Sequence, residues 1–213
     1  MSLNQLNLSR KKLFSFDFDG TLVKSNAIKE NAYAETLEND EYLLAKLEKI
    51  KKNNDKIDRY GIFKKLCMYE KHLNCQNLLK KYSEICLQNI LKAKEVDGAF
   101  KFLSKLKKNN KLCIINSATP LINLVKIVGN LKLKNHFDGV YGGPVSKTEN
   151  LFHAMLKFNL SSVNVIVIGD GENDRVCAES IKCQFVGIQN SFSNFKIKPS
   201  FIINDFNEII DLI

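Results

Sequence analysis

Residues 13–22, which read LFSFDFDGTL, place two aspartates at the end of an apolar run. The side chains of a strand alternate between its two faces, so Asp17 and Asp19 share a side if the strand continues, and Gly20 then lets the chain turn sharply. Two carboxylates this close repel each other unless a cation or a proton lies between them. The pair therefore indicates either a functional site or a solvated Asp-Gly turn at a strand end.

After residue 95, apolar runs of strand length alternate with segments of helical periodicity. The runs are LCIINSA, which ends its strand at Ser117, then GVYGG, VNVIVIGD, QFVGI and FIIND, and helices are expected at 97–106, 120–128, 147–158 and 172–181. Asp97 is expected to cap the first of these helices, and Gly129 to end the second. Strands that are apolar on both faces and separated by helices predict a parallel sheet covered on both sides, which is an α/β fold.

The segment between the first two strands has a different character. Residues 25–94 contain no proline, one glycine and no β-branched run, and their apolar residues recur at helical spacing. This pattern predicts about four amphipathic helices, with Asn39-Asp40 as a break and N-cap and a second break at 53–55. We therefore expect an α/β core of residues 1–23 and 96–213 that is interrupted by a helical domain of residues 24–95. Residues 1–12 are polar and are expected to be frayed.

Composition favours a globular protein that acts on anions. The chain has 213 residues, 45% of them apolar, and a formal net charge of +9. No apolar run approaches the ~18 residues that span a bilayer, so we expect a cytoplasmic protein without a membrane partner. Its basic residues are mostly lysines spread along the chain, so we expect no nucleic-acid partner, although the positive field favours anionic substrates. The cysteines and histidines lack zinc-ligand spacing.

Polar residues suited to catalysis follow four of the predicted strands. Ligand sites form at the carboxyl ends of parallel strands. Besides the first two aspartates, these ends carry Asn116, Ser117 and Thr119, then Lys147, and finally Gly169-Asp170 and Asp174. Carboxylates bind Mg²⁺ through hard oxygen ligands, while a hydroxyl, a backbone N–H and an ammonium can bind phosphate oxygens. The set is the one that magnesium-assisted phosphoryl transfer requires.

Four motifs in this set resemble, in order, the signature motifs of the haloacid dehalogenase superfamily. They are DFDGT at 17–21, Ser117 of IINSATP, Lys147 of PVSK and GDGEND at 169–174. The helical segment between the first and second motifs is similar in position to the cap of the phosphoglycolate phosphatase-like branch. The resemblance implies a Rossmann-like core and a helical cap that closes over the site, excludes water and contacts the leaving group.

The resemblance also implies a role for each motif residue. Asp17 would be the nucleophile that forms an aspartyl-phosphate, and Asp19 would protonate the leaving group and then activate water. The phosphoryl group would be bound by Ser117, Ala118 and Lys147, and Mg²⁺ by Asp17, the backbone carbonyl of Asp19, Asp170 and Asp174. An acid at Asp19 implies phosphate ester chemistry, because dehalogenases and phosphonate-cleaving members lack it.

Two more residues are candidate substrate contacts, Arg59 in the helical segment and Asn173 in the fourth motif. The stretches NAIKENAYAETL and D-R-Y-x-x-F resemble chains associated with surface-polysaccharide or nucleotide-sugar pathways, which implies a sugar phosphate substrate. One position departs from the family pattern, because Lys24-Ser25 stands where many members have Asp-Ser. The contact made at this point is therefore an open question.

The leading prediction is a magnesium-dependent phosphatase that hydrolyses a small phosphate monoester, such as a sugar phosphate or a phosphoglycolate-like compound, as a monomer or homodimer. A phosphomutase of the β-phosphoglucomutase type remains an alternative, because it would use the same aspartyl-phosphate. A receiver-like signalling module is a further alternative from a different class. The inserted helical segment and the acid at Asp19 count against the signalling module.

Overall fold

The computed structural model describes residues 3–53 and 57–213, and the chain divides into two compact units. One unit contains the chain up to Ser25 together with Ala93–Ile213, and the other is Asn26–Lys92. The backbone N–H of Lys24 donates to the carbonyl of Lys94 at 2.8 Å, within the larger unit. The smaller unit therefore begins two residues after the predicted start of the helical domain at residue 24, and it ends three residues before the predicted end at residue 95.

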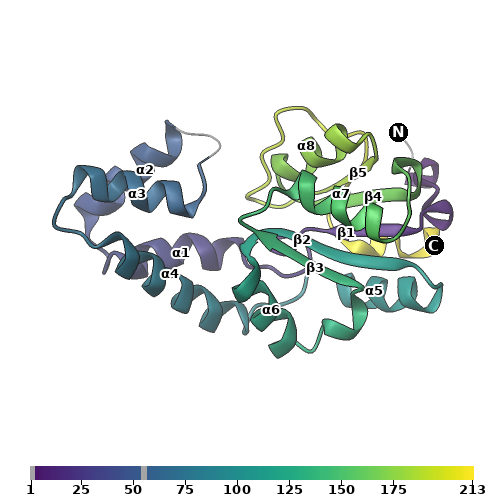
Figure 1. Cartoon of the computed structure of the whole chain (residues 1–213), viewed down its shortest axis with the longest axis horizontal. Coiled ribbons are helices and arrows are strands. Elements are labelled where there is room, and N and C mark those ends of the chain that lie inside the picture. Colours follow the sequence, from purple (N-terminus) through teal and green to yellow (C-terminus); the bar gives the residue numbers. More distant parts are fainter. Residues whose placement is uncertain (1–2, 54–56) are drawn as a thin grey trace. The chain divides into compact units, whose positions relative to one another are not determined.

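The larger unit is built on a six-stranded parallel sheet in the order β3-β2-β1-β4-β5-β6 (Figure 1). The strands are β1 (Leu13–Phe16), β2 (Leu112–Pro120), β3 (Gly139–Gly143), β4 (Val165–Gly169), β5 (Gln184–Ile188) and β6 (Ile202–Ile203). Figure 1 shows α5 (Ala99–Lys108) and α6 (Leu121–Asn130) on one face, and α7 (Lys147–Lys157) and α8 (Glu172–Ile181) on the other. The predicted α/β fold is confirmed.

Strand β1 is buried on both faces, which fixes its register. Phe14 and Phe16 each lie 6.2 Å from the ring of Phe102 in α5. On the opposite face, Leu13 packs in a cluster that includes Leu151 of α7, with Leu13 paired to residues of both β2 and β4. A slip of one residue would exchange the two faces, so packing holds the end of β1, and therefore the first aspartate motif, at one height on the sheet.

Four local predictions in the core are wrong. Residues 3–10 are not frayed, because they form two short 3₁₀ helices, Leu3–Leu6 and Leu8–Arg10, in which Leu6 and Leu8 are fully buried. Asp97 does not cap α5. Its carboxylate pairs with the Lys24 ammonium at 2.8 Å, and Gly98 occupies the N-cap position with φ 77°.

Helix α6 does not end at Gly129 but continues to Asn130. The turn that follows uses Lys132, whose φ of 57° lies in the left-handed region, so a glycine was not needed to end the helix. The strand expected from Val163 begins at Val165, because residues 162–164 form a 3₁₀ helix.

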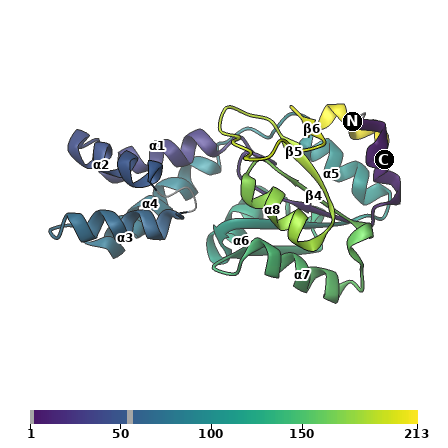
Figure 2. The same ribbon diagram turned by 90° about the horizontal axis from the view of Figure 1, so that it is seen from above.

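The smaller unit contains the four predicted helices, α1 (Asn26–Thr36), α2 (Glu41–Lys52), α3 (Arg59–Tyr69) and α4 (Cys75–Ile90). Helix α1 packs against α4, and α3 packs against both α2 and α4. Figure 2 shows the four helices from a second side. The Asp40 carboxylate accepts from the N–H of Leu43 at 3.0 Å, which confirms it as the N-cap of α2. Residues 54 and 55 of the second predicted break lie outside the described residues. Among those described, the structure contains no helix with the length and apolarity of a membrane span.

Candidate active site

The first motif leaves the sheet at the carboxyl end of β1. The N–H of Asp17 donates to the carbonyl of Ile168 in β4 at 2.9 Å, so the aspartate continues the ladder beyond the strand. Gly20 then turns the chain with φ 76°, a conformation that glycine adopts without steric strain, and its N–H donates to Val23 at 2.8 Å. Asp17 and Asp19 are only 6% and 8% exposed. The burial of both carboxylates excludes the alternative of a solvated Asp-Gly turn.

Lys147 lies between two buried acids. It is the first residue of α7, whose start is fixed by a capping box between Ser146 and Glu149. The Lys147 ammonium donates to Asp17 Oδ1 at 2.6 Å and to Asp174 Oδ1 at 2.7 Å. Burial alone would lower the pKa of Lys147, but the two carboxylates outweigh burial and raise this pKa above its ordinary value. The side chain is therefore a fixed positive charge between the first and fourth motifs.

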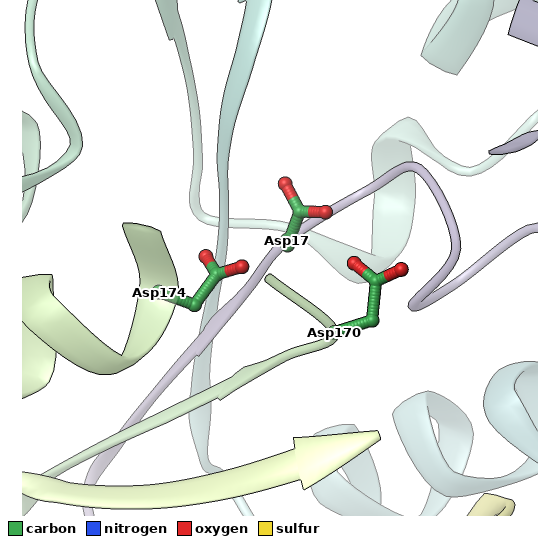
Figure 3. A group of neighbouring side chains, drawn as sticks. All are labelled: Asp17, Asp170 and Asp174. Carbon is green, nitrogen blue, oxygen red and sulfur yellow. The ribbon is translucent and has the colours of Figure 1, made fainter. Parts of the chain in front are cut away.

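Three carboxylates converge at this edge of the sheet. Asp170 directly follows β4, Asp174 lies in the first turn of α8, and an oxygen of each lies within 4.8 Å of the others and of an Asp17 oxygen (Figure 3). Burial raises the pKa of Asp174 to about 7; Lys147 opposes this shift, while the charges of Asp17 and Asp170 add to it. Three acids against one ammonium leave an excess of negative charge on hard oxygen donors. The residues present therefore fit a divalent cation.

Asp19 faces different partners from Asp17. The hydroxyl of Ser25 donates to Asp19 Oδ1 at 2.7 Å, and the hydroxyl of Thr119 donates to Asp19 Oδ2 at 2.9 Å. All three residues are buried. The carboxylate of Asp19 is thus oriented by neutral hydroxyls and is not part of the three-acid group. Ser25 answers the question left open by the Lys24-Ser25 departure, since its contact is with Asp19.

The second motif lies at the end of β2. Ser117 is 2% exposed, and its hydroxyl oxygen accepts from the N–H of Thr119 at 3.1 Å. Ala118 is exposed, at a point where the pairing of β2 with β3 shifts register between Asn116 and Pro120. The amide nitrogen of Asn116 donates to the carbonyl of Lys147 at 2.8 Å. This bond joins the second motif to the residue that carries the ammonium.

The two remaining predicted contacts belong to different units. Asn173 is exposed in the first turn of α8. Arg59 is the first residue of α3 in the smaller unit, where its guanidinium lies 5.8 Å from the centre of the Tyr82 ring. Sequence reasoning missed Asn190, whose amide nitrogen donates to Asp170 Oδ2 at 2.8 Å. No local pattern marks this residue, since it lies 20 positions from its partner.

Comparisons with known proteins identify the family of this chain and a similar fold. A family model described as haloacid dehalogenase-like hydrolase matches residues 15–188, a range that includes all four motifs. A predicted phosphoglycolate phosphatase from Haemophilus somnus is similar in structure, with a TM-score of 0.76 and 19% identity over 95% of this chain and 98% of that one. No curated protein sequence matches the chain significantly.

Two further solved structures have a similar fold. A candidate haloacid dehalogenase hydrolase from Bacillus subtilis, YfnB, was solved bound to magnesium; it has a TM-score of 0.74 and 16% identity over 95% of this chain and 98% of its own. CbbY from Rhodobacter sphaeroides, solved with phosphate, has a TM-score of 0.73 and 14% identity over 93% of this chain and 96% of its own. At these identities the likeness shows the fold.

Proposed function

The chain belongs to the haloacid dehalogenase-like hydrolase family, and from this we propose that it is a magnesium-dependent phosphatase acting on a small phosphate monoester through an aspartyl-phosphate. The observation that carries the proposal is the Lys147 ammonium bonded to both Asp17 and Asp174 inside a buried group of three carboxylates. A structural ion pair would need one acid for one base. A further cation would offset the charge of this excess of buried acid.

We assign the first chemical step to Asp17. A carboxylate oxygen of Asp17 attacks the phosphorus atom, and the bond from phosphorus to the leaving oxygen breaks as the new bond forms. Asp19 gives its proton to the leaving oxygen, so an alcohol departs. Water then attacks the phosphorus of the aspartyl-phosphate while Asp19 accepts its proton, which releases phosphate and restores Asp17. The bonds from Ser25 and Thr119 hold Asp19 in one orientation for both transfers.

The other motif residues bind charge in this proposal. Ser117, the backbone N–H of Ala118 and the Lys147 ammonium bind phosphoryl oxygens, and preorganised donors of this kind stabilise charge that moves in the transition state. Bound Mg²⁺ would neutralise part of the phosphate charge, and it would be held by Asp17, Asp170, Asp174 and the backbone carbonyl of Asp19. The magnesium-bound Bacillus subtilis structure of similar fold supports this choice of metal.

We further propose that residues 24–95 act as a cap that contacts the leaving group, with Arg59 and Asn173 as candidate substrate contacts. A sugar phosphate or a phosphoglycolate-like compound is the proposed substrate class. The formal net charge of +9 supports a small anion as ligand, because the mean field concentrates anions near the protein. The phosphate complex of CbbY supports phosphate recognition by this fold.

The experiment is a phosphate-release screen with and without Mg²⁺ over sugar phosphates, phosphoglycolate, nucleotides and acetyl phosphate. We expect one substrate class to dominate, and Asp17→Asn to abolish turnover because an amide is a poor nucleophile. Circular dichroism of the variant checks that the fold is intact. Unchanged hydrolysis by Asp17→Asn in a clean preparation would overturn the proposal. Turnover that requires a bisphosphate activator would instead favour a phosphomutase.

A further inference from the structure

A residue after β5 reaches back to the candidate metal site. The amide nitrogen of Asn190 donates to Asp170 Oδ2 at 2.8 Å and to the carbonyl of Gly20 at 3.2 Å. The first contact is with the acid of the fourth motif, and the second is with the turn of the first motif. One side chain therefore joins the two motifs that supply the three-acid group, from a segment that belongs to neither.

The orientation of Asn190 is itself fixed by its own loop. Its amide oxygen accepts from the N–H of Phe192 at 2.8 Å, so its amide nitrogen is the group that faces Asp170. Its backbone N–H donates to the hydroxyl oxygen of Ser193 at 3.1 Å, and that hydroxyl donates to the carbonyl of Ile188 at 2.8 Å, where β5 ends. These bonds connect Asn190, and with it the amide donor, to the end of β5.

The second oxygen of Asp170 is held less closely. The hydroxyl of Thr21 donates to Asp170 Oδ1 at 3.4 Å, which is long for an O–H donor. The last torsion of an aspartate side chain is broad, so the orientation of the carboxylate depends on the donors that hold it. The bond from Asn190 is shorter than the bond from Thr21 and restrains the plane of this carboxylate with a neutral donor that adds no competing charge.

We propose that Asn190 is a positioning residue that orients Asp170 toward a divalent cation. This inference rests on the proposed function, because it takes the group of Asp17, Asp170 and Asp174 as the cation site. Removing a side chain that hydrogen-bonds to a metal ligand commonly lowers metal affinity by about 10-fold to 100-fold. The bonds of Asn190 to Asp170 and to Gly20 are the contacts through which it would act.

The experiment compares Asn190→Ala with Ser193→Ala as a matched control. The Ser193 hydroxyl supports the same loop through its bonds to Asn190 and Ile188 and not through Asp170, so its variant separates loop stability from carboxylate orientation. Isothermal titration of the whole metal-free protein with Mg²⁺, without substrate, gives the dissociation constant. We expect Asn190→Ala to weaken Mg²⁺ binding by about 10-fold or more, and Ser193→Ala to change it by less than about threefold. Thermal unfolding of each metal-free variant reports the fold.

Two outcomes would overturn the inference: an unchanged Mg²⁺ dissociation constant for Asn190→Ala, or an equal loss in both variants, which would assign the effect to the loop. Wild-type protein that binds no Mg²⁺ would instead overturn the proposed cation site itself. The kinetic companion measurement is the Mg²⁺ concentration that gives half-maximal phosphate release. This concentration is expected to rise in Asn190→Ala while kcat at saturating Mg²⁺ stays close to that of the wild type.

Discussion

The two aspartates of the first motif, Asp17 and Asp19, have hydrogen-bond partners that differ in charge. The Asp17 carboxylate accepts from an ammonium that also reaches Asp174, whereas the Asp19 carboxylate accepts from the hydroxyls of Ser25 and Thr119. A hydroxyl can also accept a hydrogen bond, so it can serve a carboxyl group with or without its proton. Under the proposed function, this difference suits Asp17 to attack phosphorus and Asp19 to exchange a proton.

Ser25→Ala tests the role of Asp19. Losing one of two hydroxyl donors costs about 1 kcal/mol, so kcat for an alkyl phosphate is expected to fall about 5-fold to 10-fold. The fall is expected to be smaller for p-nitrophenyl phosphate, because its leaving group needs little protonation. Ser180→Ala is the control, since the Ser180 hydroxyl donates to a backbone carbonyl within its own helix. Equal losses on both substrates would contradict the assignment of Asp19 as general acid.

At the scale of elements, three helices of the smaller unit share one aromatic cluster. The ring of Tyr33 in α1 lies 4.6 Å from Tyr82 in α4 and 5.6 Å from Phe63 in α3. The guanidinium of Arg59 lies over Tyr82, so the start of α3 is tied to the same cluster. Burial raises the pKa of Tyr33 to about 12 and raises the pKa of Tyr82 as well. The helices are therefore held together by rings that remain neutral.

This cluster predicts a loss of stability in alkali. An unfolded chain ionises its tyrosines near pH ~10, whereas the folded unit resists ionising these two. The stability that they confer is complete below pH ~10 and is lost as the pH rises toward 12. Absorbance of ionised phenol and far-ultraviolet circular dichroism, recorded on the same samples, would show these rings ionising together with the loss of helix. Tyr82→Phe identifies its share of the absorbance. Full ionisation with helicity intact would refute the prediction.

At the scale of the whole molecule, a buried excess of acid links folding to cation binding. The native state brings three carboxylates to within 4.8 Å of one another, which the unfolded chain does not. A ligand that binds only the native state stabilises it by an amount that grows with its concentration, about 2.7 kcal/mol at 100 times its dissociation constant. Mg²⁺ is therefore expected to stabilise the protein whether or not a substrate is present.

Differential scanning fluorimetry tests this link. Saturating Mg²⁺ is expected to raise Tm by roughly 5–10 °C, and EDTA to reverse the shift. Lys147→Ala removes the ammonium between two acids, so its metal-free form is expected to be less stable by about 3–5 kcal/mol and to gain more from Mg²⁺ than the wild type. Sodium chloride at equal ionic strength is the control. A Tm unaffected by Mg²⁺ would argue against a cation site.

Features of the fold that follow from local pattern were predictable, and features that depend on distant pairing were not. Asp17, Ser117 and Asp170 each follow an apolar run, so the sequence places them at strand ends. The bond from Asn190 to Asp170 exists only because β5 lies beside β4, an arrangement without a local signal. Asp97 was wrongly predicted as a cap for the same reason, because its ion pair with Lys24 spans 73 positions.

The two chain segments that connect the units lie side by side. Val23 and Glu95 form an antiparallel bridge, and the N–H of Lys24 donates to Lys94 at 2.8 Å. The inserted residues therefore leave and rejoin the core at neighbouring points, so the length of the insert does not stretch the connection between β1 and β2. In evolutionary terms this makes the insert an exchangeable module. A gene that gained a different insert between residues 25 and 93 could acquire a new selectivity while inheriting the catalytic sheet unaltered.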